Sequence, residues 1–169
     1  MPRTPRDAAI FILSLWLSIS CLLPIGASWA DSEDAQLARL EGQLVQGVND
    51  FRKSRRLIPL ERRPELDAVA RAHSEDMVRR HFFAHRNPEG LDWVGRLRRA
   101  GIQGFALAGE NLAMTSQSRP NTRILEGWKH SPAHLKNLVA RPYNATGVGI
   151  ARGPDGALYY TQLYLTFPR

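Results

Sequence analysis

The segment Trp128–Asn137 contains a proline at a point where one helix has to end and another can begin. Pro132 has no backbone N–H, so a helix that leads into this segment should stop just before it. Ser131 is a favourable N-cap and Pro132 a favourable first helical residue, so we expect a second helix to start at once. His134 then lies in the first turn, where the positive end of the helix dipole favours a neutral imidazole. A neutral imidazole can bind a metal ion or accept a proton.

Residues 1–30 have the features of a secretory signal peptide. Two arginines precede an apolar run over residues 8–23, and the small residues Ser28 and Ala30 occupy the cleavage positions. We therefore predict cleavage after Ala30 and a secreted or periplasmic mature protein. The length of the apolar run leaves an uncleaved membrane anchor as the alternative.

Cys21 is the only cysteine and lies in the predicted leader. The mature chain would then have no disulfide, no thiolate nucleophile and no cysteine-ligated zinc site. The whole chain carries a net charge of +7, which suits anionic partners such as phospholipid or envelope polymers. An arginine-rich solvated surface is the simpler interpretation. The basic run 52–56 has no interleaved aromatic residues, so we expect no nucleic-acid partner.

The hydrophobic pattern predicts helices first and a β-hairpin last. Apolar residues recur at helical spacing over residues 34–54, and Pro64 begins a second helix whose apolar stripe includes His73. We expect His73 to be a hydrogen-bonded core residue. A short helix over residues 91–100 follows, then the two helices around Pro132. Over residues 146–150, larger residues alternate with two glycines, which predicts a strand with close backbone approach, and residues 157–167 have the pattern of a central strand. This order indicates an α+β domain with an antiparallel sheet packed against helices.

Three separate segments offer side chains that can do chemistry. His85 lies on a loop at a helix exit, Glu110 lies in a small apolar stretch, and His134 begins a helix. Two histidines and a carboxylate suit a divalent metal with an open position, most readily Zn²⁺. They equally suit a His–Glu acid–base pair. The chain has no HExxH helix, phosphate loop or GxSxG elbow to decide between these.

Short motifs in a fixed order give the chain a family resemblance. It resembles the CAP superfamily (cysteine-rich secretory proteins, antigen 5, pathogenesis-related 1) in its cysteine-free bacterial form, over residues 44–167. We divide the chain into a signal peptide at 1–30, a helical lead-in at 31–43 and a CAP domain at 44–169. The motifs are Val48-Asn49-Asp50-Phe51-Arg52, Ala70-Arg71-Ala72-His73-Ser74-Glu75-Asp76-Met77, Phe83-Ala84-His85, Pro88-Glu89-Gly90, Gly109-Glu110-Asn111, Trp128, Ser131-Pro132-Ala133-His134, Asn137, Gly147-Val148-Gly149 and Tyr160-Thr161-Gln162.

The resemblance implies a three-layer α-β-α sandwich with a cleft that contains His85, His134 and Glu110. The family often has a second glutamate shortly after the tryptophan, and here Ser131 takes that place. We expect Ser131 to act as the helix N-cap. A Ser131–His134 hydrolase dyad is the weaker alternative to a metal site formed by His85 and His134. We expect Asn111 and Trp128 to have structural roles, Asn111 through hydrogen bonds to the backbone and Trp128 as a core residue.

Two main functions follow from the resemblance. The first is a secreted binding module for a divalent cation, with a small-molecule, lipid or envelope-polymer ligand and no turnover. The alternative is a hydrolase, metal-dependent or serine-type, that uses the same cleft through His85, Glu110, His134 and Ser131. Adhesion to anionic envelope polymers through the arginines is a third idea. Membrane contact is expected only through an uncleaved leader or surface charge. Whether the protein is an enzyme stays open at this level, because a fold does not imply an activity.

Overall fold

The computed structural model describes residues 25–168, so the predicted leader falls mainly outside the described residues. Five helices and four strands follow one another along this part of the chain. The helices are α1 (Ile25–Ser54), α2 (Pro64–Arg79), α3 (Trp93–Arg99), α4 (Pro120–His130) and α5 (Pro132–Val139). The strands are β1 (Glu61–Arg62), β2 (Leu107–Thr115), β3 (Ala145–Arg152) and β4 (Leu158–Thr166). The predicted helix boundary at Pro132 is confirmed, because α4 ends at His130 and α5 begins at Pro132.

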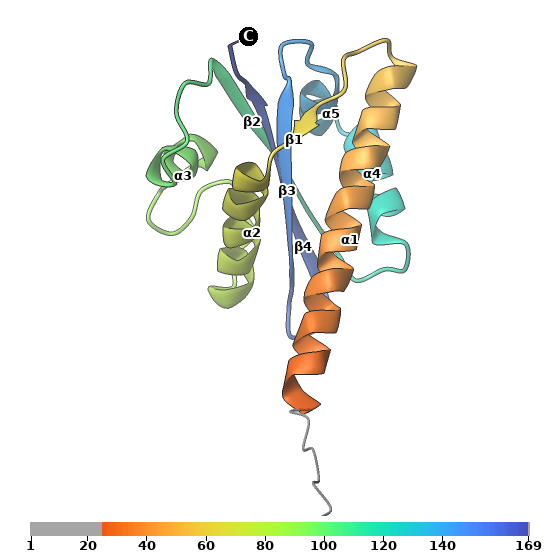
Figure 1. Ribbon diagram of the computed structural model, residues 1–169, viewed down its shortest axis with the longest axis vertical. Coiled ribbons are helices and arrows are strands. Elements are labelled where there is room, and N and C mark those ends of the chain that lie inside the picture. The colour runs from red at the N-terminus through yellow and green to blue at the C-terminus, as the bar shows by residue number, and fades with distance from the viewer. Residues whose placement is uncertain (1–24, 169) are drawn as a thin grey trace, which may run out of the picture.

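The elements form three layers, as expected for an α-β-α sandwich. The sheet has the order β1-β3-β4-β2, with α1, α4 and α5 on one face and α2 and α3 on the other (Figure 1). β3 and β2 both pair antiparallel with β4. β4 is therefore an interior strand, as its apolar sequence predicts. The sheet is not wholly antiparallel, since the two-residue strand β1 pairs parallel with β3.

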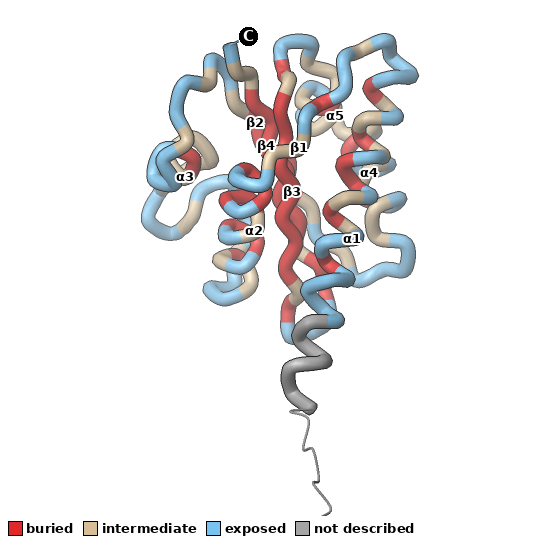
Figure 2. Tube along the Cα trace, viewed as in Figure 1, coloured by how far each residue is buried: buried red, intermediate tan, exposed pale blue. Residues whose placement is uncertain are grey.

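Buried residues concentrate on the two central strands, β3 and β4 (Figure 2). The glycines of β3 let α2 approach the sheet closely, as the alternation in the sequence suggests. A Cβ added at Gly149 would lie 1.9 Å from the backbone nitrogen of Arg71, and one at Gly147 would lie 2.3 Å from the carbonyl carbon of Leu66. The helix backbone therefore rests directly on the strand, which fixes the height of α2 above the sheet.

A buried arginine on α1 holds the end of α5 in place. The side chain of Arg52 is fully buried. Its guanidinium donates hydrogen bonds to backbone carbonyls at the end of α5 and in the segment that follows, those of Leu138 (2.9 Å), Ala140 (3.1 Å) and Tyr143 (3.2 Å). These carbonyls have no helical partner of their own, so the cation satisfies them and anchors the helix that carries His134.

Within residues 25–168, none of the helices combines the length and the apolar character needed to span a bilayer.

Candidate functional site

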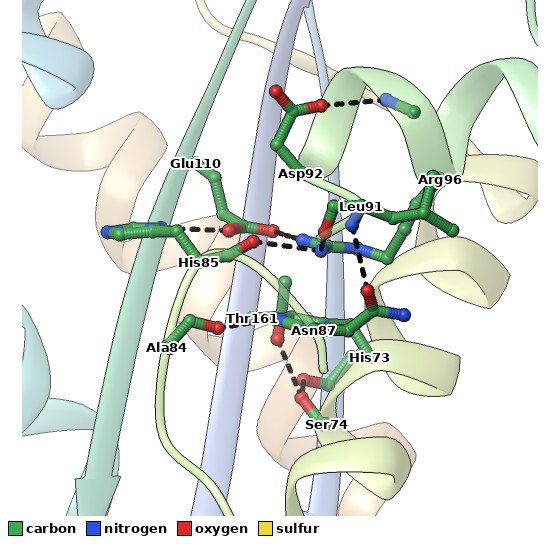
Figure 3. Close-up of polar contacts among 12 residues, drawn as sticks. His73, Ser74, Ala84, His85, Asn87, Leu91, Asp92, Arg96, Glu110 and Thr161 are labelled. Carbon is green, nitrogen blue, oxygen red and sulfur yellow. Dashed lines mark hydrogen bonds and ion pairs between the residues drawn. The ribbon is translucent and has the colours of Figure 1, made fainter. Parts of the chain in front are cut away.

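Glu110 lies on β2, one of the two edge strands of the sheet, and its side chain is completely buried. One carboxylate oxygen, Oε1, lies 2.8 Å from Nδ1 of His85, and the other, Oε2, pairs with the guanidinium of Arg96 (Figure 3). An ionised carboxylate only accepts hydrogen bonds, so His85 carries its proton on Nδ1. A carboxylate in an apolar stretch needs compensating partners, and the structure supplies two.

Arg96 is the site residue that the sequence analysis missed. It lies on α3, whose first turn is fixed by Asp92, because the Asp92 carboxylate accepts a hydrogen bond from the Gly95 N–H at 2.9 Å. The Arg96 guanidinium also donates to the carbonyl oxygens of His85 (2.9 Å) and Leu91 (3.1 Å). It therefore holds both the carboxylate and the loop that carries His85. One feature of the sequence indicated such a residue: Glu110 lies in an apolar stretch, where a carboxylate needs a compensating partner.

His85 lies on the loop between α2 and α3, as predicted. The loop turns at Gly90, which has a φ of +80°, and the Asn87 side chain accepts a hydrogen bond from the Leu91 N–H at 2.9 Å. The ring of Trp93 meets the His85 ring edge-on, with 5.8 Å between centroids. The imidazole is about half exposed, so one side is held by the protein and the other is open to solvent.

His134 begins α5, and its Nδ1 lies 2.9 Å from the hydroxyl oxygen of Ser131. The prediction that the Ser131 side chain caps the helix is wrong. Ser131 occupies the N-cap position, and its carbonyl accepts from the Leu135 N–H at 2.8 Å, but its hydroxyl makes no capping bond. The physical reason is competition: the imidazole one turn away offers a partner on the same side of the helix. The hydroxyl and the imidazole are thus paired.

Burial lowers the pKa of His134, and the nearby His85 lowers it further through like-charge repulsion. A lowered pKa favours the neutral imidazole, as the sequence predicts for His134. The causes differ from the expected one, because they are desolvation and a second imidazole and not the dipole of α5. The two histidines are joined to neighbouring residues of β2, although 49 positions separate them in sequence: His85 bonds Glu110, and the His134 carbonyl accepts from Asn111.

Two asparagines connect the strand that carries Glu110 to the helix that carries His134. Asn137 donates to the backbone carbonyl of Glu110 at 3.1 Å and to the side-chain oxygen of Asn111 at 2.8 Å. Asn111 in turn donates to the carbonyl of His134 at 3.2 Å. Trp128, which is 2% exposed, donates to the backbone of β2 at 3.0 Å. The structural roles expected for Asn111 and Trp128 are therefore observed.

The four predicted site residues thus form two pairs, His85 with Glu110 and Ser131 with His134. Among residues 25–168, no group of three or more His, Cys, Asp or Glu side chains is arranged to hold a metal ion. Both oxygens of Glu110 are already engaged. A cation at this site would therefore have two imidazoles as its protein ligands, and Glu110 would act behind His85.

Comparison with known proteins identifies the family. The model of the CAP family, described as the cysteine-rich secretory protein family, matches residues 45–164, and the chain belongs to this family. It is 33% identical over 125 residues to the Bacillus subtilis membrane protein YlbC, a match that covers 74% of this chain and 34% of YlbC.

Solved structures give the same fold. An extracellular protein of Bacillus anthracis that contains an SCP domain is 32% identical, with a TM-score of 0.67, and the match covers 76% of this chain and 41% of that one. An outer surface protein of Borrelia burgdorferi shares the fold at 20% identity, with a TM-score of 0.70 and coverage of 77% of this chain and 94% of that one. The chain spans less than half of YlbC and of the B. anthracis protein.

Proposed function

We propose that this CAP-family chain is an exported binding module in which His85 and His134 hold a divalent cation, most readily Zn²⁺. One observation carries the proposal. In each histidine Nδ1 is bonded to a protein group, to Glu110 in one and to Ser131 in the other, and Nε2 has no hydrogen-bond partner among the described residues. Two imidazoles fixed through Nδ1 present Nε2 to a ligand, which is the usual arrangement around a bound metal.

The surroundings of each imidazole support cation binding. Glu110 accepts a hydrogen bond from Nδ1–H of His85, which fixes the tautomer and leaves Nε2 as the ring nitrogen with a free lone pair. Burial lowers the pKa of His134, so this ring is neutral at pH 7. With only two protein ligands, the remaining coordination positions are free for water or for oxygen atoms of a ligand. A cation held there would supply Lewis acidity towards carboxylate, phosphate or carbonyl oxygens, which small molecules, lipid headgroups and envelope polymers all carry.

Export is part of the proposal. The leader-like sequence of residues 1–30 supports it, and the similar protein of B. anthracis is described as extracellular.

Zinc calorimetry on the mature protein tests the proposal. The protein is expressed with its own leader and purified after export, so that the cell makes the cleavage. We expect binding of one Zn²⁺, lost in both His85→Ala and His134→Ala. His130→Ala is the matched control, because His130 lies on the neighbouring helix and bonds the carbonyl of Glu126 at 2.7 Å. No binding by the folded wild type, or equal binding by all three variants, would contradict the metal site.

A serine-type hydrolase is the second candidate, favoured by one observation. The Ser131 hydroxyl is free of the capping role and lies 2.9 Å from Nδ1 of a histidine whose pKa is lowered by burial. A neutral imidazole in that position can accept the Ser131 proton while the hydroxyl oxygen attacks an acyl carbon, and it can pass that proton to the leaving group when the original acyl bond breaks.

Labelling with a fluorophosphonate probe separates the two candidates. A hydrolase predicts covalent labelling at Ser131, abolished in Ser131→Ala and in His134→Ala. The binding module predicts no labelling, and it predicts zinc affinity in Ser131→Ala that is reduced but present, because the hydroxyl only orients His134.

A further inference from the structure

His73 lies directly beneath the loop that carries His85. It belongs to the buried face of α2, is 1% exposed, and places Nε2 3.0 Å from the carbonyl oxygen of Ala84 (Figure 3). A carbonyl oxygen only accepts, so Nε2–H of His73 is the donor. The expectation of a hydrogen-bonded core histidine is thereby met. The acceptor belongs to the residue just before His85.

Packing alone does not require a histidine at this position. Nδ1 of His73 is buried and has no hydrogen-bond partner among the described residues. An unsatisfied buried acceptor costs about 1–3 kcal/mol. Met77, one turn further along the same stripe, is fully buried without any such group. A leucine or methionine would therefore fill the stripe at lower cost, and what they could not supply is the hydrogen bond to Ala84.

The backbone around His85 is held from two sides. His73 binds the carbonyl of Ala84, and Arg96 binds the carbonyl of His85 at 2.9 Å. The ring of Phe82 also packs against His73, with 5.8 Å between centroids. These two carbonyls belong to the peptide planes on either side of the His85 α-carbon, so holding both of them fixes the direction in which the His85 side chain leaves the backbone. Arg96 also holds the Glu110 carboxylate, which is the group that the His85 ring contacts.

We propose that His73 is a positioning residue of the His85–Glu110 site. Its hydrogen bond to Ala84 orients the loop so that Nδ1 of His85 meets Glu110 and Nε2 remains available. The part of the inference that concerns metal affinity rests on the proposed function. The orientation of His85 does not, because it can be measured without metal.

The test compares His73→Leu, His73→Gln and Ser74→Ala with the wild type. Leucine keeps the bulk and removes the donor, whereas the glutamine amide can donate to Ala84 from nearly the same place. Ser74 is the matched control: it is the next residue, is equally buried, and bonds Thr161 and the Gly149 carbonyl on β3, away from the loop. Long-range ¹H–¹⁵N spectra of the metal-free proteins report which nitrogen of His85 carries the proton, and zinc calorimetry reports affinity.

We expect His85 in the wild type to show a protonated Nδ1 and a bare Nε2. In His73→Leu the two tautomers should mix, and zinc affinity should fall about 10–100-fold, as for other outer partners of metal ligands. In His73→Gln and Ser74→Ala both readings should stay near those of the wild type, although Ser74→Ala lowers the melting temperature.

Two results would overturn the positioning role: a wild-type His85 spectrum in His73→Leu, or a loss in Ser74→Ala as large as that in His73→Leu. If His73→Leu does not fold, a displaced His85 spectrum in His73→Gln overturns the role and a wild-type spectrum supports it. If the wild type binds no zinc, the proposed function fails, and the metal-free spectra still decide the role of His73.

Discussion

Replacing Arg96 with methionine tests whether the Glu110 carboxylate depends on a single cation. The Glu110 side chain has no exposed surface, and that of Arg96 is 11% exposed. Methionine keeps much of the apolar stem of arginine and removes the guanidinium. The carboxylate would then be left in a water-poor setting with His85 as its remaining side-chain partner.

Removing one member of a buried ion pair costs about 3–5 kcal/mol, because the other charge stays buried without compensation. Here we expect a value near the lower end of that range, about 3 kcal/mol. The half-exposed His85 ring stays 2.8 Å from Glu110, so the carboxylate keeps one hydrogen-bond partner after the arginine is removed. Adding Glu110→Gln removes the stranded charge, so the double variant should be more stable than Arg96→Met by about 1–2 kcal/mol.

Urea denaturation of the two single variants and the double variant measures the coupling between Arg96 and Glu110. Arg80→Met is the control, because Arg80 also forms a close ion pair with a glutamate, Glu89, but on the surface, at 2.6 Å. Solvent screens that pair, so the control should not differ measurably from the wild type. A loss below about 1 kcal/mol in Arg96→Met, or strictly additive effects in the double variant, would refute the argument that Glu110 is desolvated.

Two further predictions concern the scaffold and its titration. Gly149→Ala should lower the free energy of unfolding in urea by about 3 kcal/mol or more, because the new methyl group would meet the Arg71 backbone. Gly127→Ala is the control and should be neutral or stabilising, because Gly127 lies on a helix with open space around it. Equal effects of the two substitutions would contradict the close approach of α2 to β3. Burial lowers the pKa of His73 and of His134 below the ordinary 6.5, so the unfolded chain takes up protons before the folded chain does, and stability should fall as the pH drops from about 7 to 5. His73 supplies up to about 1.4 kcal/mol per pH unit, and the more exposed His134 supplies less. His73→Gln should flatten the pH profile, and an unchanged slope would show that His73 does not titrate in this window.

Much of the architecture was predictable because it rests on local rules. Pro132 predicted the boundary between α4 and α5. The glycines of β3 predicted a close backbone contact, and the structure shows that the contact is with α2. Strand β2 was not assigned from the sequence, because its small residues have no clear alternation. The parallel pairing of β1 was missed as well, since a two-residue strand has no periodicity to detect.

The residues of the candidate site were predicted as a set, without the partners that each of them contacts. The family motifs pointed to His85, Glu110, His134 and Ser131, but local rules assigned the wrong partner to Ser131. The capping rule considers only the backbone of the same helix, whereas the observed hydroxyl pairs with the His134 ring. Arg96 carries no motif, and its role arises because α3 folds back over β2.

The sequence by itself determined the boundary between α4 and α5, which faces are buried and which side chains can do chemistry, since these depend on residues a few positions apart. The first helix was placed less well, because α1 begins at Ile25 and the apolar periodicity indicated a start near residue 34. Only the tertiary structure decided how those side chains pair. Glu110 lies 25 positions from His85 and 14 from Arg96, and a chain of two asparagines links its strand to the helix of His134. The physical reason is that a buried carboxylate takes its partners from whatever the packing of α3, β2 and the intervening loop brings within hydrogen-bond distance, and no local pattern encodes that distance.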